Sequence, residues 1–400
     1  MSDTAADPRL LRAPPKRGIR LSWADERFRS IIWQILVVGL VAGVIWWLVR
    51  NTAHNLEVRR IATGWGFLSR EAGLPVAESL IPYSPTDTYA RALLVGVLNT
   101  LKIAVVGVVV ATILGTLIGI ARLSRNWLLS RIAAAYIEVV RDLPLLLQLL
   151  FWYAILQGLP SPRQSLNPAT GVFLSNRGLK LPWIQWQDAH SFALLGLVLG
   201  ILGAFFYARS ARAKQMADGQ PRKVWPVALG LVLGLPLAIW AAYGAPWQGD
   251  IPALRGFNFQ GGLTVTPEYF ALLIGLVMYT AAFIAEIVRA GILSVPKGQW
   301  EAAEALGLQR GRIMRMIVLP QALRVIVPPM TSQYLNLTKN SSLAVAIGYQ
   351  DIVSISNTTL NQTGQAIEGI AIIMVVYLTI SLSISLFMNW YNARIALVER

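Results

Sequence analysis

Residues 301–320, EAAEALGLQRGRIMRMIVLP, are the stretch around which the rest of this 400-residue chain is organised. The part from Gln299 to Leu306 is rich in Ala and Glu and favours a helix, and Gly307 is placed to end that helix. Residues 310–318 favour a second short helix before the proline that closes the stretch. Because long apolar runs flank these residues on both sides, the sequence predicts a helical hairpin at a membrane surface.

The spacing inside this stretch is specific. Glu-Ala-Ala is followed after three residues by Gly307, after nine more by Ile317, and after one more by Leu-Pro. An ordinary amphipathic surface helix is the alternative, but the full pattern resembles the coupling motif of permease subunits in ATP-binding-cassette importers. The resemblance implies that the hairpin docks on a cytoplasmic ATPase. The residues implied at that contact are Gly298, Glu301, Ala302, Ala303, Gly307, Leu319 and Pro320.

The composition indicates an integral membrane protein. The chain is 55% hydrophobic and 14% charged, which is more apolar than soluble domains usually are. Its net charge of +15 is dispersed between apolar runs instead of forming one patch, so it indicates membrane topology and not nucleic-acid binding. The absence of Cys excludes disulfides and thiolate metal sites, and only His54 and His190 supply imidazoles.

Eight apolar runs predict an all-α protein with about eight transmembrane helices. Relative to the five-span permease core that the resemblance implies, the other runs are an N-terminal span and an inserted hairpin of two spans. The predicted spans are 31–49, 93–121, 143–156, 191–207, 224–243, 269–287, 322–348 and 367–387. The predicted segments are a basic tail at 1–30, the N-terminal span, an outer segment at 50–91, core spans at 92–157, an inserted region at 158–268, a second core part at 269–388 with the coupling loop at 289–321, and a C-terminal segment at 389–400.

The distribution of basic residues predicts which side each loop occupies. Segments assigned to the cytoplasm hold 24 Lys and Arg residues, and those assigned to the outside hold nine. Positively charged loops stay in the cytoplasm, so both chain ends are expected there. The run 31–49 is followed by Arg-Asn-Thr, so it is expected to be a retained signal anchor. The resemblance to importer permeases implies that the membrane is a bacterial inner membrane.

Small residues at four-residue spacing predict close helix contacts at two places. Gly115 and Gly119 lie near the inner end of the second predicted span. The string Gly-Leu-Val-Leu-Gly occurs at both 196–200 and 230–234, so facing ridges predict a tight inserted hairpin, although chance repetition in an apolar region is an even alternative.

Charged and polar residues within the predicted membrane segments are costly unless they face a partner or a pathway. We therefore expect Arg141, Glu286, Lys339, Asn340 and Ser341 to line a translocation path. Glu286 has a structural alternative, an ion pair with Arg289 one helical turn away. Arg141 has a similar alternative partner in the glutamate at 138. The seventh predicted span is expected to be interrupted at Pro328-Pro329 and again at 336–342.

The chain lacks a phosphate-binding loop, because it contains no Gly-Lys pair, and it has no nucleophile elbow or paired zinc ligands. An enzymatic function is therefore not expected. A secondary transporter driven by an ion gradient and a passive channel are the competing classes. A secondary transporter usually has two inverted halves with matching broken helices, and the sequence has one coupling loop and one broken span.

Wider stretches resemble the polar amino-acid uptake permeases. These are AAFIAEIVRAGI at 281–292, LPQA at 319–322, KNSSL at 339–343 and YIEVVRDLP at 136–144, where the family more often has Gly-Thr in place of Asp-Leu. The long outer segment and the inserted hairpin are similar to the larger general L-amino-acid permeases of Gram-negative bacteria. The resemblance implies a second permease subunit that is a paralogue, a dimer of cytoplasmic ATP-binding subunits, and a periplasmic amino-acid-binding protein. ATP and magnesium are then bound by the ATPase, and this chain, surrounded by membrane lipid, binds no cofactor.

Overall fold

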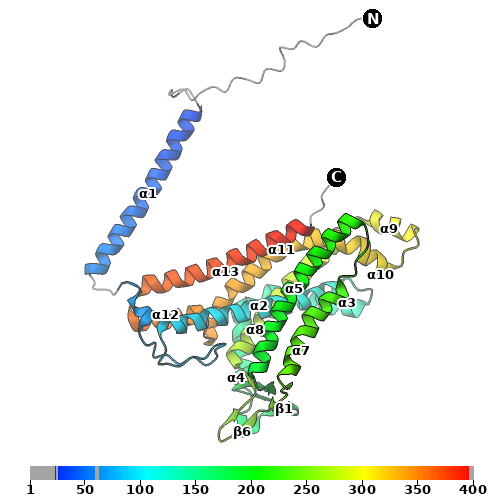
Figure 1. Ribbon diagram of the computed structural model, residues 1–400. Helices are drawn as coiled ribbons and strands as arrows, with labels where there is room; N and C mark the ends of the chain where they lie inside the picture. The colour runs from blue at the N-terminus through cyan, green and yellow to red at the C-terminus, as the bar shows by residue number, and fades with distance from the viewer. Residues whose placement is uncertain (1–22, 24–25, 59–62, 396–400) are drawn as a thin grey trace.

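The computed structural model describes residue 23 and residues 26–58 and 63–395, so most of the predicted basic tail and the end of the C-terminal segment lie outside the described residues. The described part is mostly helical (Figure 1). Its α-helices are α1 (Glu26–Val58), α2 (Tyr89–Arg122), α3 (Trp127–Asp142), α4 (Leu145–Gln157), α5 (Asp188–Asp218), α6 (Trp225–Leu229), α7 (Leu235–Ala242), α8 (Pro267–Leu293), α9 (Lys297–Ala305), α10 (Arg310–Ile313), α11 (Leu319–Asn340), α12 (Ile352–Thr363) and α13 (Ala366–Ile395).

Seven helical segments in the described residues are long and apolar enough to cross a membrane, and the number is eight if the bent pair α3–α4 forms one span. The helical membrane fold and the approximate number of spans expected from the sequence are therefore confirmed. Helix α1 stands apart from the other helices, and none of its apolar window is buried (Figure 1).

The predicted third span is wrong in detail. Residues 127–142, which include a predicted cytoplasmic loop, form the amphipathic helix α3, and α4 follows at an angle of 105°. The break lies at Leu143, whose backbone is extended because the following Pro144 disfavours the helical conformation. With 13 residues, α4 is about 20 Å long and too short to span a bilayer alone.

Helices α2, α8 and α11 form the centre of the core, with α4 and α13 against them. The prediction of close packing at Gly115 and Gly119 is confirmed. A Cβ atom at Gly115 would lie 2.7 Å from Ile284 Cβ, and one at Gly119 would lie 2.7 Å from the Ala285 carbonyl oxygen. The two glycines therefore let the backbone of α2 lie directly against side-chain and carbonyl atoms of α8.

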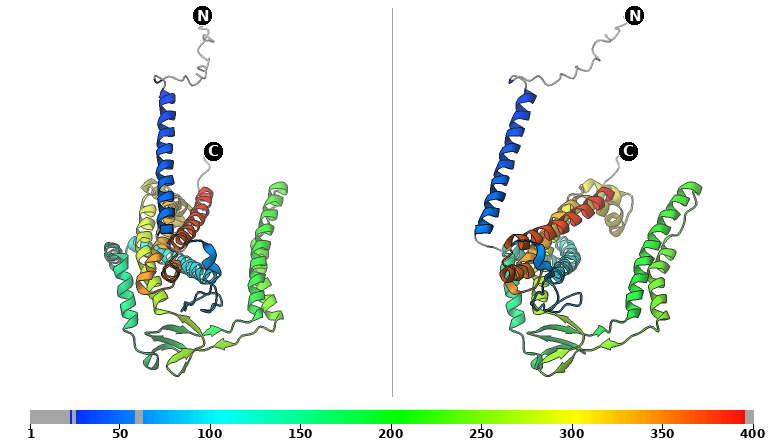
Figure 2. Two further views of the ribbon diagram at one scale, coloured as in Figure 1. Left: turned by 90° about the vertical axis from the view of Figure 1, so that its left-hand side faces the viewer. Right: turned by 60° about the vertical axis from the view of Figure 1, so that its left-hand side comes forward.

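The inserted hairpin consists of α5, α6, the π-helical turn η4 (Gly230–Gly234) and α7, which pack on one another. It stands to one side of the core in both views of Figure 2. The prediction of facing glycine ridges is only half right: Gly196 and Gly200 contact the opposite helix, whereas Gly230 and Gly234 have no atom within 4 Å of a built Cβ. One small-residue ridge is enough to bring the two helices together.

Short strands cover the end of the molecule at which α5 and α8 begin, called the sheet end below (Figure 2). The sequence predicted loops here, and that prediction missed an antiparallel sheet of order β1-β2-β3-β8 and two two-stranded sheets, β4-β5 and β6-β7. The strands are β1 (Leu166–Ala169), β2 (Val172–Ser175), β3 (Gly178–Leu181), β4 (Trp183–Ile184), β5 (Gly249–Asp250), β6 (Ala253–Arg255), β7 (Asn258–Gln260) and β8 (Leu263–Val265), with a short helix η3 (Pro162–Gln164).

The seventh predicted span differs from expectation at both ends. The helix begins at Arg310 and passes through the π-helical turn η5 (Met314–Val318) into α11, so the proline at 320 does not end it. Proline lacks the N–H that bonds four residues back, and a wide π turn accommodates such a defect. Pro328 and Pro329 lie inside α11 without interrupting it, and after Asn340 the chain continues as the 3-10 helix η6 (Ser341–Ile347).

Candidate functional site

The hairpin of α9 and α10 ends α9 in a Schellman turn at Gly307. The Gly307 N–H donates to the Glu304 carbonyl at 2.9 Å, and the Leu308 N–H donates to the Ala303 carbonyl at 3.2 Å. Gly307 has a φ of +71°, a left-handed backbone that residues with a Cβ rarely adopt. The prediction that Gly307 ends this helix is confirmed.

Most of the residues expected at an ATPase contact are exposed, either on this hairpin or at the start of α11. Glu301, Ala302, Gly298, Leu319 and Pro320 are exposed, as is Gly307. Ala303 is the exception, because only 1% of its surface is exposed and it packs in the core cluster that contains Ile313 and Val318. Its small side chain therefore lets α9 lie close to the rest of the hairpin.

Glu286 lies at the centre of a charged cluster between α2, α3 and α8. Its carboxylate pairs with Arg289 at 2.5 Å and with Arg122 at 3.6 Å, and Arg122 lies 3.9 Å from Glu138. The sequence alternative of an i,i+3 pair with Arg289 is confirmed, whereas the pair of Glu138 with Arg141 is wrong. Arg141 instead places its guanidinium 5.0 Å from the centre of the Phe283 ring.

A polar cavity of about 280 Å³ lies between α8 and α11. Asn340 lines it, and Phe283 joins the cavity to the guanidinium of Arg141. Of the residues that the sequence assigned to a path, Asn340 lines the cavity, and Arg141 lies beside it on the Phe283 ring. The lining residues are Tyr279, Thr280, Phe283, Gln333, Asn336 and Asn340.

The other two expected path residues in this region differ in burial, because Lys339 is exposed and Ser341 is buried. Lys339 is exposed in the last turn of α11 and does not line the cavity. Ser341 is fully buried, donates to the Thr338 carbonyl at 2.7 Å and lies 3.5 Å from the Tyr377 hydroxyl. Its hydroxyl is therefore used inside the protein, and Ser341 does not line this cavity.

The sequence reasoning missed Gln333 and Asn336 on this cavity. Together with Asn340 they stand at positions i, i+3 and i+7, which places three amide side chains on one face of a helix. That spacing within an apolar run was the available signal. The partners from α8 carry no such signal, because Tyr279 and Phe283 are ordinary residues of an apolar helix.

The fold and this site define a helical membrane protein with a polar cavity between core helices and a surface hairpin ended by glycine. Residues 230–397 match the family "Binding-protein-dependent transport system inner membrane component". The chain belongs to the permease subunits of amino-acid ABC transporters. This relationship gives no support to the alternative of an ion-coupled secondary transporter.

Three relatives are similar over almost the whole chain. The "General L-amino acid transport system permease protein AapQ" of Rhizobium johnstonii is 50% identical over 96% of both chains. The "Putative amino-acid ABC transporter permease protein YhdX" of Escherichia coli is 51% identical over 95% of this chain and 97% of that one. The "Glutamate/glutamine/aspartate/asparagine transport system permease protein BztB" of Rhodobacter capsulatus is 44% identical over 97% of this chain and 99% of that one.

Proposed function

We propose that this chain is a permease subunit of an importer for general, mainly polar L-amino acids. The observation that carries the proposal is its 50% identity over 96% of its length to a general L-amino-acid permease. In this proposal the chain is not an enzyme. It works with a paralogous second permease, a dimer of ATPase subunits that hold ATP and magnesium, and a periplasmic amino-acid-binding protein. It lies in the bacterial inner membrane with both ends in the cytoplasm.

The hairpin of α9 and α10 is the proposed contact with the ATPase. Its exposed face carries a glutamate and small residues, and the Schellman turn at Gly307 gives α9 a defined end without side-chain bulk. The connection between α5 and α6 is basic, so in this proposal it lies on the same cytoplasmic side. The strands of the sheet end then lie on the periplasmic side.

The cavity between α8 and α11 is the proposed part of the translocation path. Its amide and hydroxyl groups can donate to and accept from the polar groups of an amino acid. Asn340 and Arg141 belong to this path, and Lys339, exposed one residue before Asn340, is proposed to attract the substrate carboxylate. Glu286 holds the helices around the path through its arginines and does not touch the substrate.

The coupling proposal is tested with Gly307→Val in the assembled complex. A β-branched residue strains the left-handed backbone by about 1–3 kcal/mol, and its side chain crowds a docking surface. We expect a permease that inserts normally, loses the ATPase during purification, and imports no amino acid into vesicles supplied with the binding protein and ATP.

Gly311→Val is the matched control, because Gly311 lies in the same hairpin, has open space around it and has no positive φ. This variant is expected to keep the ATPase. Normal uptake by Gly307→Val contradicts the coupling assignment, and loss of the ATPase in both variants assigns the effect to bulk instead of the turn.

The path proposal is tested with Lys339→Met, compared with Lys223→Met in the exposed connection of the inserted hairpin. We expect the first variant to assemble with its ATPase and to import glutamate at least about 10-fold more slowly, because a charge-assisted contact to the carboxylate is lost. Normal glutamate uptake by Lys339→Met removes Lys339 from the path.

A further inference from the structure

Helix α1 is long enough to cross a membrane and lies outside the packed core. None of its apolar stretch is buried among the described residues, and the helix stands apart from the others (Figure 1). A bilayer holds the apolar parts of all spans in one layer about 30 Å thick, so α1 shares that layer with the core in a membrane. The attachment of α1 to the rest of the chain limits which face of the core it can reach.

The chain that follows α1 is fixed at the start of α13. The Gly64 N–H donates to the carboxylate of Glu368, in the first turn of α13, at 2.5 Å. The short 3-10 helix η2 (Trp65–Ser69) then places Phe67, which is fully buried, in a cluster with residues of α2 and α13. The Phe67 ring lies 6.0 Å from the ring of Tyr89, the first residue of α2. The chain is therefore anchored at the end of the core where α2 and α13 begin.

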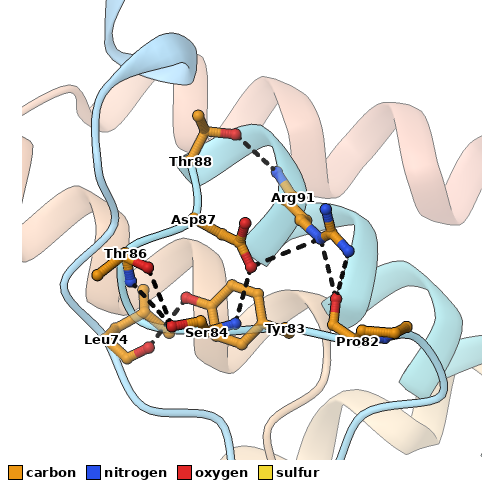
Figure 3. A network of polar contacts seen from close by, with 8 residues as sticks. All are labelled: Leu74, Pro82, Tyr83, Ser84, Thr86, Asp87, Thr88 and Arg91. Atoms are coloured by element: carbon orange, nitrogen blue, oxygen red, sulfur yellow. Dashed lines mark hydrogen bonds and ion pairs between the residues drawn. The ribbon is translucent and has the colours of Figure 1, made fainter.

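A polar network holds the next segment, residues 71–88, against α2 (Figure 3). The Arg91 guanidinium of α2 donates to the Pro82 carbonyl at 2.5 Å. The Tyr83 hydroxyl donates to the Leu74 carbonyl at 2.9 Å. These contacts fix the chain on the far side of η2, so the anchor does not depend on the position of α1.

The link between α1 and this anchor is short. Val58, the last residue of α1, and Gly64 are six positions apart, and an extended chain of that length spans about 20 Å. The end of α1 therefore lies within about 20 Å of the start of α13. Because α1 ends where α2 and α13 begin, α1 is antiparallel to both helices when it lies beside them.

A groove of about 620 Å³ lies between α2 and α13, and α11 contributes to its lining. Its walls run from Val97 to Val109 on α2 and from Val375 to Met388 on α13, so the groove is about 18–20 Å long. The lining is almost entirely apolar and suits an apolar helix. Lipid tails are equally apolar, so this property alone does not select α1.

The groove and α1 also carry complementary polar groups. Gln34 is the only residue of the run 31–49 with an amide, hydroxyl or charged side chain, and it is exposed on α1. Thr379 and Ser383 lie on the α13 wall of the groove. Their hydroxyls donate to the carbonyls of Val375 and Thr379 at 2.7 and 2.8 Å, which leaves oxygen lone pairs that can accept from an amide.

These polar groups lie at matching distances from the anchor. Gln34 is 15 positions before Val49, the end of its apolar run, which is about 22 Å along the helix. Thr379 and Ser383 are 12 and 16 positions after Ile367, the start of theirs, which is about 18 and 24 Å. In an antiparallel pair with those two ends level, the amide of Gln34 lies between the two hydroxyls.

We propose that α1 packs in the groove between α2 and α13, antiparallel to both, with Gln34, Val38, Val41 and Ile45 toward the core. These four residues recur at helical spacing and form one face, whereas Gly39 lies about 140° around the helix from Gln34 and faces lipid. The proposal goes beyond amino-acid import and does not rest on it. With α1 in the groove, the second permease subunit has to contact another face of the core.

Photo-crosslinking in membrane vesicles that contain the assembled complex tests this placement. Val375, which is exposed and lines the groove, is replaced by p-benzoyl-L-phenylalanine, a photoreactive residue that links to neighbouring C–H bonds. We expect a link to α1 of the same chain, found by mass spectrometry in the tryptic peptide 30–50 at the gel mobility of one chain. Met374, which is similarly exposed but does not line the groove, is the matched control and should not label this peptide.

Any other result overturns the proposal. Labelling of the second permease subunit or of lipid from position 375 assigns the groove to that neighbour. An adduct with the mass of two copies assigns it to a second copy of this chain. Equal labelling of α1 from both positions places α1 near α13 but outside the groove.

The orientation of α1 is tested by adding a second substitution to the photoreactive variant. Gln34→Leu removes the amide and keeps an apolar side chain. The yield of the link to α1 is then expected to fall about 2- to 5-fold, because hydrogen bonds between membrane helices are modest in strength. Gly39→Leu, on the opposite face, should leave the yield unchanged. An unchanged yield with Gln34→Leu, or equal losses with both substitutions, overturns the proposed orientation.

Discussion

Two pairs of helices in this molecule are built on the same small-residue spacing and have different surroundings. In the α2–α8 pair, Gly115 and Gly119 face α8, and 61% of the residues in the most apolar 18-residue stretch of α8 are buried. In the inserted hairpin, Gly196 and Gly200 face the opposite helix, but 17% of the corresponding stretch of α5 and none of that of Trp225–Ala242 is buried. The small-residue spacing brings two helices together, and the pair becomes part of a core only where further helices cover it.

This difference explains which helices carry polar and charged side chains between them. Lipid tails are as apolar as Leu, so a helix pair surrounded by lipid keeps an apolar exterior. Helix α8, enclosed by α2, α4 and α11, carries Thr280 at a polar cavity and Glu286 in an ion-pair cluster.

Gly115→Leu is expected to prevent stable packing of the core. A Cβ atom at this position already meets Ile284 Cβ at 2.7 Å and the Ala281 carbonyl oxygen at 2.8 Å, and overpacking of this kind costs about 3 kcal/mol. The thermal midpoint of the purified chain in detergent measures the effect. Gly39→Leu in α1, where a Cβ meets no atom within 4 Å, is the control and should leave the midpoint unchanged.

Asp351→Asn is expected to change how the stability of the core depends on pH. Asp351 is fully buried beside α2, and burial raises the pKa of its carboxyl from 3.8 to about 7. Because the folded chain holds this proton more strongly than the unfolded chain, its contribution to stability is present below about pH 4 and is lost as the pH rises through 7. The loss is at most about 1.4 kcal/mol per pH unit.

Asn at position 351 can still accept from the Ser354 N–H, which Asp351 now caps at 2.8 Å. The thermal midpoint of the variant should therefore fall less than that of the natural chain between pH 5 and pH 8. Parallel profiles for the two proteins contradict the prediction.

Gly200→Leu is expected to separate the inserted hairpin while leaving the core intact. A built Cβ at this position lies 2.1 Å from the Leu231 carbonyl oxygen, so the two helices must move apart, at a cost of about 1–3 kcal/mol. Hydrogen exchange should rise in α5 and α7 and stay constant in α2 and α8. Gly230→Leu, in the second copy of the motif, has open space and should change neither region. Faster exchange in α2 after the first substitution would show that the hairpin supports the core.

Asp218→Asn is expected to have the smallest effect. Asp218 pairs with Arg222 at 2.6 Å at the exposed end of the hairpin, where water screens the charges. Glu286→Gln is its counterpart in the core and weakens contacts to Arg289 and Arg122 at once. The thermal midpoint should fall for Glu286→Gln and stay unchanged for Asp218→Asn. Equal midpoints for the two variants would remove the distinction between the core and hairpin charges.

Features that depend on near neighbours in the chain could be predicted from the sequence. The left-handed glycine at 307, the close approach at Gly115 and the pair of Glu286 with Arg289 are set by residues a few positions apart or by the absence of a side chain. The membrane spans follow in the same way, because hydrophobicity over a helix length is a local property. These features make up most of the fold and the surface hairpin of the candidate site.

Features that depend on contacts between distant residues were decided only by the tertiary structure. Pro144 signals a helix break, but packing against α8 sets the 105° bend. Two predicted loops pair as strands through residues 84 positions apart, Lys180 and Thr264, and Glu286 gains Arg122 from another helix. The cavity that Glu78 lines likewise exists only in the packed chain, where Glu78 pairs with Lys102 of α2. The backbone hydrogen bonds of a helix join residues four positions apart, so the nearby sequence determines a helix. A sheet, an ion pair between helices or a cavity needs residues that are distant in the chain and forms only when the chain has packed.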